Sequence, residues 1–270
     1  MELGVNVPNF GPGTDPGRLR AWAQTVEGLG FDLLMVSDHV VITPDVAEQY
    51  PAPFYEPFTT LSWLAGITQR VRLGTTVLIV PYRHPLLVAR MAANLNQLSG
   101  GRLVLGVGVG WARQEFEALG QRVERRGRQT DESLDTIRAA LANTEDYGKG
   151  DIPIWVGGNS DVAVRRAVRV GDAWHPLRFR LSRVREVLER ETALPGFAPR
   201  IALRFTDAPI TDPDRLAGHG TTEQVAADLE ELRRLGAQSI VFDPFNDDPD
   251  ETLHPETAWR ALATVKELLS

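Results

Sequence analysis

Short apolar runs alternate with stretches of helical periodicity along the chain. The runs are mostly apolar rather than alternating, which predicts strands of a parallel sheet that is buried on both faces. Apolar residues at helical spacing follow each run, and glycine marks the end of several of these stretches. The eight predicted strands cover residues 3–7, 33–37, 72–79, 103–107, 153–158, 172–176, 201–207 and 239–244. The eight predicted helices cover residues 17–29, 58–69, 85–98, 129–142, 160–169, 181–192, 222–235 and 255–269.

Eight regular strand–helix units in 270 residues fit a closed (β/α)8 TIM barrel, with residues 1–270 as a single domain. The alternative is an open, doubly wound sheet, which would favour a glycine-rich dinucleotide turn after its first strand. The first strand here is followed by the residues PNFGP (8–12), which do not form that motif. We therefore expect the barrel.

The chemistry of such barrels takes place where the strands end and the following loops begin. Asp38 and His39 follow the second strand and are the most polar pair at any strand end. A histidine there can donate to a ligand or transfer a proton near neutral pH, with the neighbouring carboxylate positioned to support it. We expect a catalytic role for both residues. The alternative is a hydrogen-bonded pair that closes the end of the barrel.

Three glycines stand two residues apart in the stretch RLVLGVGVGWARQE (102–115), at Gly106, Gly108 and Gly110. The spacing matches neither the dinucleotide motif nor the P-loop. It indicates either a loop that approaches a phosphate or a strand that packs closely against its neighbours.

A second glycine pair, Gly157 and Gly158, lies between a strand and a helix in WVGGNSDVAVRRA (155–167). Free N–H groups at the start of this helix, with the helix dipole behind them, would bind an anion such as a phosphate. The alternative is a tight turn with an N-cap, which needs glycine only for its backbone geometry.

Other side chains near strand ends are candidates for a pocket. We expect Phe10, Trp111 and Trp174 to line the substrate site, whereas His84 and His175 are expected to make structural hydrogen bonds. The arginine-rich stretch RVERRGR (122–128) fits a solvated surface or, alternatively, a basic lip that holds an anionic cofactor tail. No histidine or carboxylate spacing typical of a metal site occurs, so no metal is expected.

Composition narrows the class of partner. The net charge of −7 argues against general nucleic-acid binding, and the absence of cysteine excludes disulfides and thiol nucleophiles. No apolar run approaches a membrane span, and the first residues, MELGVNVPNF, lack a basic region followed by an apolar core. These features predict a cytoplasmic protein that acts on a small molecule.

Three segments together resemble a known family. They are GFDLLMVSDH, LGTTVLIVPYRHPLLVARMAANLNQLSGGRLVLGVGVGW and PIWVGGNSDVAVRRAVRVGDAW. They resemble the bacterial luciferase-like superfamily, which comprises flavin- and deazaflavin-dependent barrel oxidoreductases. The resemblance covers nearly the full chain, and its central block (71–110) is specific. It also implies a homodimer formed through the helices at 58–69 and 85–98.

The resemblance implies roles for particular residues. The family's histidine after the second strand corresponds to His39, and a non-prolyl cis peptide that backs the flavin ring corresponds to Thr76–Val77. Relatives that oxidise sugar phosphates carry a glutamate where this chain has Trp111, so that activity is not expected. The other implied cofactor contacts come from two glycine-rich strand ends: Gly108, Val109, Gly157, Gly158, Asn159 and Ser160.

Two cofactors suit the family, and they imply different reactions. Reduced FMN activates oxygen, whereas the deazaflavin coenzyme F420 reacts poorly with oxygen and transfers hydride. The arginine-rich composition, associated with GC-rich genomes, and the similarity to actinobacterial members favour F420. Its oligoglutamate tail would find partners in Arg125, Arg126 or Arg128. The expected function is hydride transfer between F420 and a small organic substrate. The alternatives are an FMN-dependent luciferase-like monooxygenase and a flavin-binding barrel without catalysis.

Overall fold

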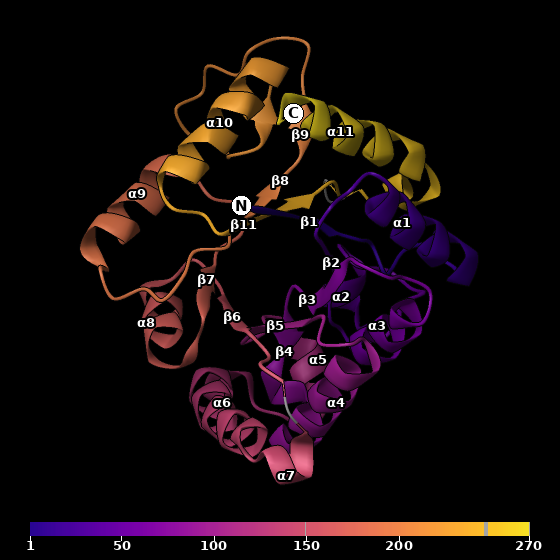
Figure 1. Cartoon of the computed structure of the whole chain (residues 1–270), viewed down its shortest axis with the longest axis vertical. Coiled ribbons are helices and arrows are strands. Elements are labelled where there is room, and N and C mark those ends of the chain that lie inside the picture. Colours follow the sequence, from indigo (N-terminus) through magenta and orange to yellow (C-terminus); the bar gives the residue numbers. More distant parts are fainter. Residues whose placement is uncertain (149, 246–247, 270) are drawn as a thin grey trace.

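Parallel strands form the wall of a barrel, and helices surround it (Figure 1). The computed structural model describes residues 1–148, 150–245 and 248–269. The strands pair in the order β7-β6-β5-β3-β2-β1-β11-β8. Two isolated bridges join the ends of this series and complete the ring, one between Trp174 and Phe197 and one between Leu177 and Arg200. The predicted (β/α)8 barrel is therefore confirmed.

The barrel strands are short and almost entirely buried, which explains their continuous apolar runs. They are β1 (Glu2–Asn6), β2 (Leu33–Val36), β3 (Arg72–Thr75), β4 (Leu78–Ile79), β5 (Leu103–Gly108), β6 (Ile154–Gly157), β7 (Ala173–His175), β8 (Arg200–Ala202) and β11 (Ser239–Asp243). A separate two-stranded sheet pairs β9 (Arg204–Phe205) with β10 (His219–Gly220).

The helices pack their apolar faces against the strands. The long ones are α1 (Pro16–Gly28), α3 (Pro57–Ala65), α4 (Pro85–Leu98), α6 (Arg126–Ala142), α8 (Asp161–Val170), α9 (Leu181–Arg190), α10 (Thr222–Arg234) and α11 (Pro255–Leu268). Short helical segments occupy the connections: α2 (Pro44–Ala47), η1 (Val80–Tyr82), α5 (Arg113–Ala118), η2 (Val123–Arg125), α7 (Thr144–Tyr147) and η3 (Pro249–Leu253). None of the helices in the described ranges has both the length and the apolar character to cross a membrane.

Local side chains explain where the helices begin. The carboxylate of Asp15 accepts a hydrogen bond from the Arg18 N–H at the start of α1, where Pro16 occupies the first turn. A capping box begins α10, in which Thr221 and Gln224 each bind the backbone N–H of the other. Such caps satisfy N–H groups that a helix leaves without partners at its start.

The third predicted strand, 72–79, is divided in the structure. Its two halves, β3 and β4, are separated by the Thr76–Val77 peptide, which is cis. The resemblance to the luciferase-like superfamily predicted this bond. The seventh predicted strand, 201–207, also divides, because only β8 pairs with the barrel while β9 turns out to β10. The arginine-rich stretch is partly helical, since α6 begins at Arg126 rather than at residue 129.

Close packing accounts for two glycines of β5. A Cβ atom at Gly106 would lie 2.0 Å from the carbonyl oxygen of Thr75, and one at Gly108 would lie 2.4 Å from a methyl group of Val77. Both positions therefore require glycine because β3 and β4 approach β5 so closely. This observation favours the close-packing interpretation of the glycine spacing.

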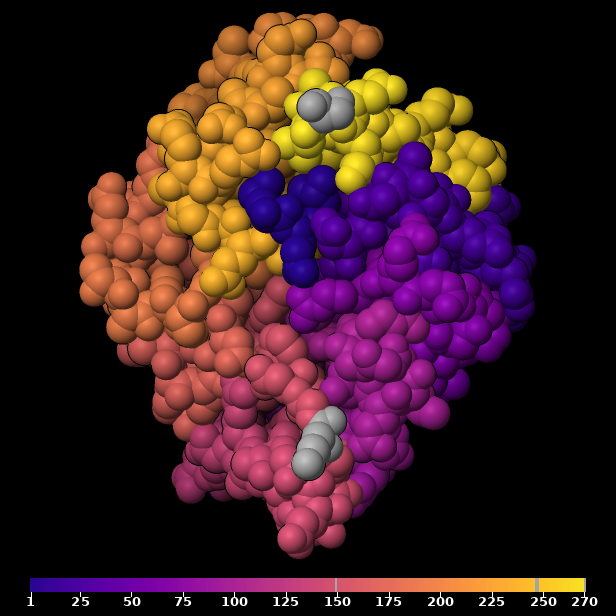
Figure 2. Space-filling model, viewed as in Figure 1, coloured from indigo at the N-terminus to yellow at the C-terminus, as the bar shows by residue number. Residues whose placement is uncertain are grey.

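The first and last strands of the barrel lie side by side. β1 pairs with β11 in parallel register from Glu2–Ser239 to Val5–Phe242. Figure 2 shows the N-terminal residues, in indigo, against the yellow C-terminal helix on the same face. Lys266 of that helix also donates a hydrogen bond to the Gly30 carbonyl. Residues far apart in sequence thus meet in one wall.

Candidate active site

A cavity of about 260 Å³ opens where the carboxyl ends of the strands meet. This is the end at which barrel chemistry is expected. Residues from six strand ends, one loop and the start of β8 line it: Ser37, Asp38, His39, Tyr50, Thr76, Val77, Ile79, Gly108, Val109, Gly110, Trp111, Gly157, Gly158, His175, Leu177 and Arg200. The structure therefore brings eight of the predicted site positions together with Trp111 around one space.

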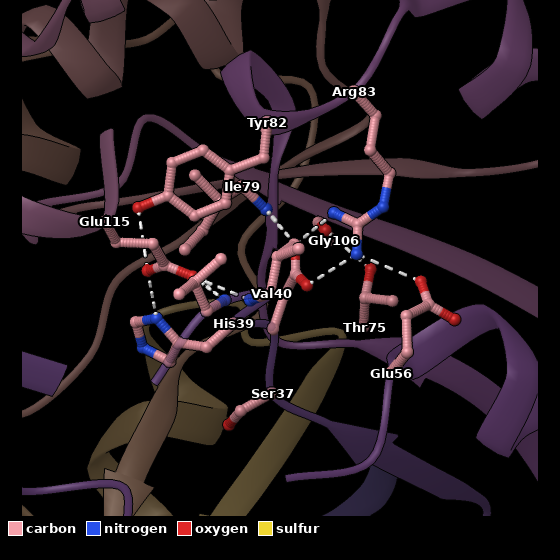
Figure 3. Close-up of polar contacts among 12 residues, drawn as sticks. Ser37, His39, Val40, Glu56, Thr75, Ile79, Tyr82, Arg83, Gly106 and Glu115 are labelled. Atoms are coloured by element: carbon pink, nitrogen blue, oxygen red, sulfur yellow. Dashed lines mark hydrogen bonds and ion pairs between the residues drawn. The ribbon is translucent and has the colours of Figure 1, made fainter. Parts of the chain in front are cut away.

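The His39 imidazole is held at the cavity by a glutamate (Figure 3). Its Nδ1 lies 2.6 Å from Oε2 of Glu115, a residue of α5 whose side chain is fully buried. No described residue hydrogen bonds to the other ring nitrogen, Nε2. The rings of Tyr50 and Trp111 flank the imidazole, with centroids 5.3 and 5.9 Å away. His39 is therefore fixed on one side and available to a ligand on the other.

Among the described residues, four donors hydrogen bond to Glu115. Besides His39, the Tyr82 hydroxyl donates to Oε2 at 2.9 Å, and the backbone N–H groups of Val40 and Val41 donate to Oε1 at 2.6 and 3.1 Å. Burial favours the neutral acid, but the bonds from His39 and the two amides outweigh it and lower the Glu115 pKa. The carboxylate is therefore ionised at neutral pH.

The expected partnership between Asp38 and His39 is wrong. The Asp38 carboxylate binds the Arg83 guanidinium through two contacts of 2.7 and 2.8 Å and accepts the Ile79 N–H at 2.8 Å. Asp38 and His39 therefore bind different partners, Arg83 and Glu115. Burial opposes the charge of Arg83, but its contacts with Asp38 and Glu56 outweigh burial and raise its pKa. Asp38 is thus part of a structural ion pair.

A hydrogen-bonded network forms the floor of the cavity. His175 Nδ1 contacts the Ala198 carbonyl, which can only accept, so this nitrogen carries the proton. Burial lowers the pKa of His175 to about 4, so the ring is neutral and its Nε2 accepts the Thr76 hydroxyl at 2.9 Å. Arg200 donates to the Thr76 carbonyl at 2.8 Å and pairs with Asp243 of β11. His175 therefore has the structural role expected of it.

The turn after β6 presents backbone donors at the start of α8. Ser160 is the N-cap, and its side chain accepts from Ala163 at 3.3 Å while its carbonyl accepts from Val164. The backbone N–H groups of residues 159–162 donate to no acceptor among the described residues. Gly158 has a φ of +120°, a conformation that L side chains rarely adopt. The turn therefore has the geometry of an anion site.

Side chains around this turn hold it in place. The Asn159 amide donates to the Leu177 carbonyl at 2.7 Å and accepts the Leu177 N–H at 3.0 Å. The indole N–H of Trp174 donates to the Gly158 carbonyl at 2.8 Å. Neither side chain lines the cavity. The Asn159 side chain is held by Leu177, whereas the Ser160 hydroxyl, which accepts from Ala163, can still donate its own proton to a phosphate.

Of the three aromatic residues expected in the substrate pocket, only Trp111 lines it. This residue is 47% exposed. Trp174 is buried beneath the glycine turn. Phe10 is fully buried behind the cavity wall, where its ring contacts those of Tyr50, Phe54 and Phe245. A position near a strand end did not reveal to which side these two rings point.

Sequence reasoning assigned no role to four polar residues of the site, although Tyr82 and Arg83 follow a predicted strand: Tyr82, Arg83, Glu115 and Arg200. Each contacts partners far away in the sequence, so no local pattern of residues predicts the contact. The signal available for Glu115 was its position, five residues beyond Gly110 at a strand end. Polar residues in the connection after a barrel strand can therefore belong to the site, as those at the strand end do.

The arginine-rich stretch lines a second, polar cavity of about 350 Å³. Arg122, Arg125 and Arg128 contribute to it beside Gln121 and Gln129. Arg128 is paired with Glu132, and Arg126 donates to the Val123 carbonyl instead of lining the cavity. Elsewhere in the described ranges, no three histidine, aspartate or glutamate side chains are grouped so that they could hold a metal ion.

Relatives of known sequence share part of the chain. An uncharacterized protein of Mycobacterium tuberculosis is 31% identical over 182 residues, which are 56% of this chain and 62% of that protein. The 4-hydroxyprotoasukamycin monooxygenase of Streptomyces nodosus subsp. asukaensis is 35% identical over 138 residues, 49% of this chain and 35% of that protein. The chain therefore matches less than two thirds of the length of either relative.

The fold has a close counterpart among solved structures. An F420-dependent secondary alcohol dehydrogenase, in complex with an F420–acetone adduct, superimposes with a TM-score of 0.74 at 17% identity, covering 99% of this chain and 98% of that one. The model of one family, described as luciferase-like monooxygenase, matches residues 1–194. This segment contains His39, the cis peptide and the glycine turn after β6. By this match the chain belongs to the luciferase-like monooxygenase family.

Proposed function

We propose that the protein is an F420-dependent oxidoreductase that interconverts a small alcohol and its carbonyl form. The observation that carries the proposal is His39, whose Nδ1 is bound by Glu115 while Nε2 has no described partner beside the cavity. A neutral imidazole held in this way is a base with one defined accepting atom. The glycine turn opens into the same cavity, so a cofactor and a substrate would meet there.

The residues present fit a phosphate-bearing flavin or deazaflavin. The N–H groups at the start of α8, which have no acceptor among the described residues, suit the phosphate, and the cavity walls formed by Val77, Gly108 and Val109 suit a flat ring. When bound, F420 supplies a ring carbon that can accept or give a hydride.

The chain itself handles the proton. In the direction of oxidation, His39 Nε2 accepts the proton of the substrate hydroxyl as the hydride leaves the adjacent carbon. In the opposite direction the imidazolium returns a proton to the carbonyl oxygen. Of the described residues that line the cavity, Arg200 is the only arginine or lysine, and it is already paired with Asp243. An uncharged substrate therefore suits this site better than a phosphorylated one.

The second cavity supports F420 over FMN. Arginines are suited to bind carboxylates, and F420 carries an oligoglutamate tail that FMN lacks. Gln129, which lines this cavity, also donates a hydrogen bond to the Pro81 carbonyl in η1, next to β4. The fold neighbour that binds an F420–acetone adduct is a further support.

A titration tests the cofactor. Purified protein would be titrated with F420, with its deazaflavin riboside lacking phosphate and tail, and with FMN. We expect F420 to bind most tightly. Arg125→Glu should weaken F420 binding a few-fold, in keeping with an exposed ion pair, and leave riboside binding unchanged. Arg260→Glu on α11, across the barrel from α6 in Figure 1, is the matched control. Binding of FMN alone would contradict the assignment.

Turnover assays test the reaction. Propan-2-ol and cyclohexanol would be offered with oxidised F420, and acetone and cyclohexanone with the reduced form, while the deazaflavin absorbance is followed. Tight F420 binding without turnover in either direction would favour the alternative of a non-catalytic flavin-binding barrel.

The second candidate is an FMN-dependent monooxygenase. The family description and the 35% identical Streptomyces monooxygenase favour it. The exposed ring of Trp111 and the apolar side chain of Val40, 44% exposed after His39, would then bound an apolar substrate. Oxygen consumption with reduced FMN, absent with reduced F420, would identify this function.

A further inference from the structure

Glu115 is the only acidic group in contact with His39 among the described residues. It comes from α5, whereas His39 follows β2, and 76 positions separate them. The same carboxylate binds the N–H groups of Val40 and Val41, the two residues that follow His39. One side chain therefore fixes both the ring and the backbone that carries it (Figure 3).

The protonation states of the cluster determine which nitrogen carries the proton. Burial and the adjacent Glu115 charge raise the pKa of Tyr82, so its phenol keeps the proton that it donates. Glu115 itself is ionised and can only accept. The short contact at His39 is therefore an Nδ1–H group donating to Oε2.

We propose that Glu115 is a positioning residue that holds the neutral His39 ring in the Nδ1–H tautomer, so that Nε2 faces the cavity as a bare base. The kinetic part of this inference rests on the proposed function, whereas the tautomer does not. A buried aspartate does the same for the catalytic histidine of serine proteases, where its replacement by asparagine keeps the geometry but favours the wrong tautomer.

Glu115→Gln changes the group that faces the His39 Nδ1 while it keeps the size of the side chain. A glutamine there has the same size, and its carbonyl can still accept the Val40 and Val41 N–H groups. Its NH2 group would face His39 and donate, which favours Nδ1 as an acceptor and moves the proton to Nε2. Tyr82→Phe is the matched control, because it removes a donor to the same oxygen while the carboxylate remains.

Nitrogen NMR reads the tautomer without any cofactor. Protein labelled with ¹⁵N in its histidines would be examined near pH 9, where a free imidazole is neutral. A His39→Gln variant assigns the His39 signals. We expect a protonated Nδ1 and a bare Nε2 in the wild type and in Tyr82→Phe, and the reverse in Glu115→Gln. A wild-type His39 with its proton on Nε2 would overturn the proposal even if the glutamine variant failed to fold.

Kinetics supply the second readout. Glu115→Gln should lower kcat by roughly 10²–10⁴ with little change in KM, the pattern of a wrongly protonated base. A folded Glu115→Gln protein that keeps the Nδ1–H tautomer would also refute the inference. If the tautomer switches while turnover is unchanged, the role of Glu115 stands and the role of His39 in the proposed function fails.

Discussion

Asp38 and Arg83 form a buried, two-pronged ion pair 45 positions apart in the chain, with contacts of 2.7 and 2.8 Å. The Asp38 side chain is fully buried, and that of Arg83 is 10% exposed. The pair ties the connection after β2 to the residues that follow η1, so it holds the segment in which His39 lies.

Removing the charge of Asp38 should therefore destabilise the fold. We expect Asp38→Asn to lower the free energy of unfolding by about 3 kcal/mol, the lower part of the range for a broken buried pair, because Glu56 still faces Arg83. Urea denaturation measures this loss. The control is Glu124→Gln, which removes an exposed ion pair with Arg113 and should change stability little. Equal effects of the two variants would contradict the structural role.

His39→Ala should separate chemistry from binding. Because Nε2 is the proposed proton acceptor, turnover should fall by roughly 10²–10⁴ while the cofactor dissociation constant changes much less. The measurements are a fluorescence titration and a single-turnover rate at saturating cofactor. An unchanged rate would exclude His39 from the chemistry.

Gly158→Leu should weaken cofactor binding tenfold or more, on the order of 1.4 kcal/mol. Its φ of +120° disfavours a side chain, and a Cβ atom would lie 3.0 Å from that of Ala163 at the start of α8. Gly100→Leu is the matched control. Gly100 also has a positive φ but lies in open space before β5, at the opposite end of the strands. If both variants bind cofactor equally well, the phosphate site lies elsewhere.

His175 makes stability depend on pH. Its folded-state pKa, lowered to about 4 by burial, is below the ordinary value of 6.5. Between these values the unfolded chain binds a proton that the folded chain does not. The free energy of unfolding should therefore fall as the pH drops from 6.5 to 4, by about 3 kcal/mol at most, and this contribution is constant above pH 6.5.

The variant His175→Asn tests this dependence of the unfolding free energy on pH. An asparagine keeps a donor of similar reach to Ala198 but does not titrate. Its unfolding free energy should be lower than that of the wild type near pH 7 and should vary less between pH 6.5 and 4. Parallel profiles for the two proteins would show that His175 is protonated in the fold.

The homodimer is a prediction about α4. Leu86, Leu87 and Leu98 of this helix are 46%, 51% and 73% exposed, an apolar surface that a second copy would cover. Sedimentation at micromolar concentration should show twice the chain mass of 29.8 kDa, and Leu87→Glu should shift it to the monomer. A wild-type protein that sediments as a monomer would refute this prediction.

The barrel could be predicted because its signals are local. Apolar runs, helical spacing and stop glycines lie within each unit, and the strand ends then mark the site. The Thr76–Val77 cis bond followed from family resemblance alone. The pairing of His39 with Glu115 instead of Asp38 could not be predicted, because it depends on how α5 packs against the end of β2. Likewise, Phe10 and Trp174 are near the site in sequence, but their orientation is set by tertiary contacts.

The network at the floor of the cavity joins residues that are synthesised at very different times. Arg200 lies in the second half of the chain, and its carboxylate partner, Asp243, comes from the last strand. Asn6 of the first strand donates to the same carboxylate at 3.1 Å. During synthesis Asn6 is made at the start of the chain, whereas Asp243 is added only when nearly the whole chain has left the ribosome. The glycine turn and His39 are made well before that point, but the site that they share is complete only when the last strand closes the wall.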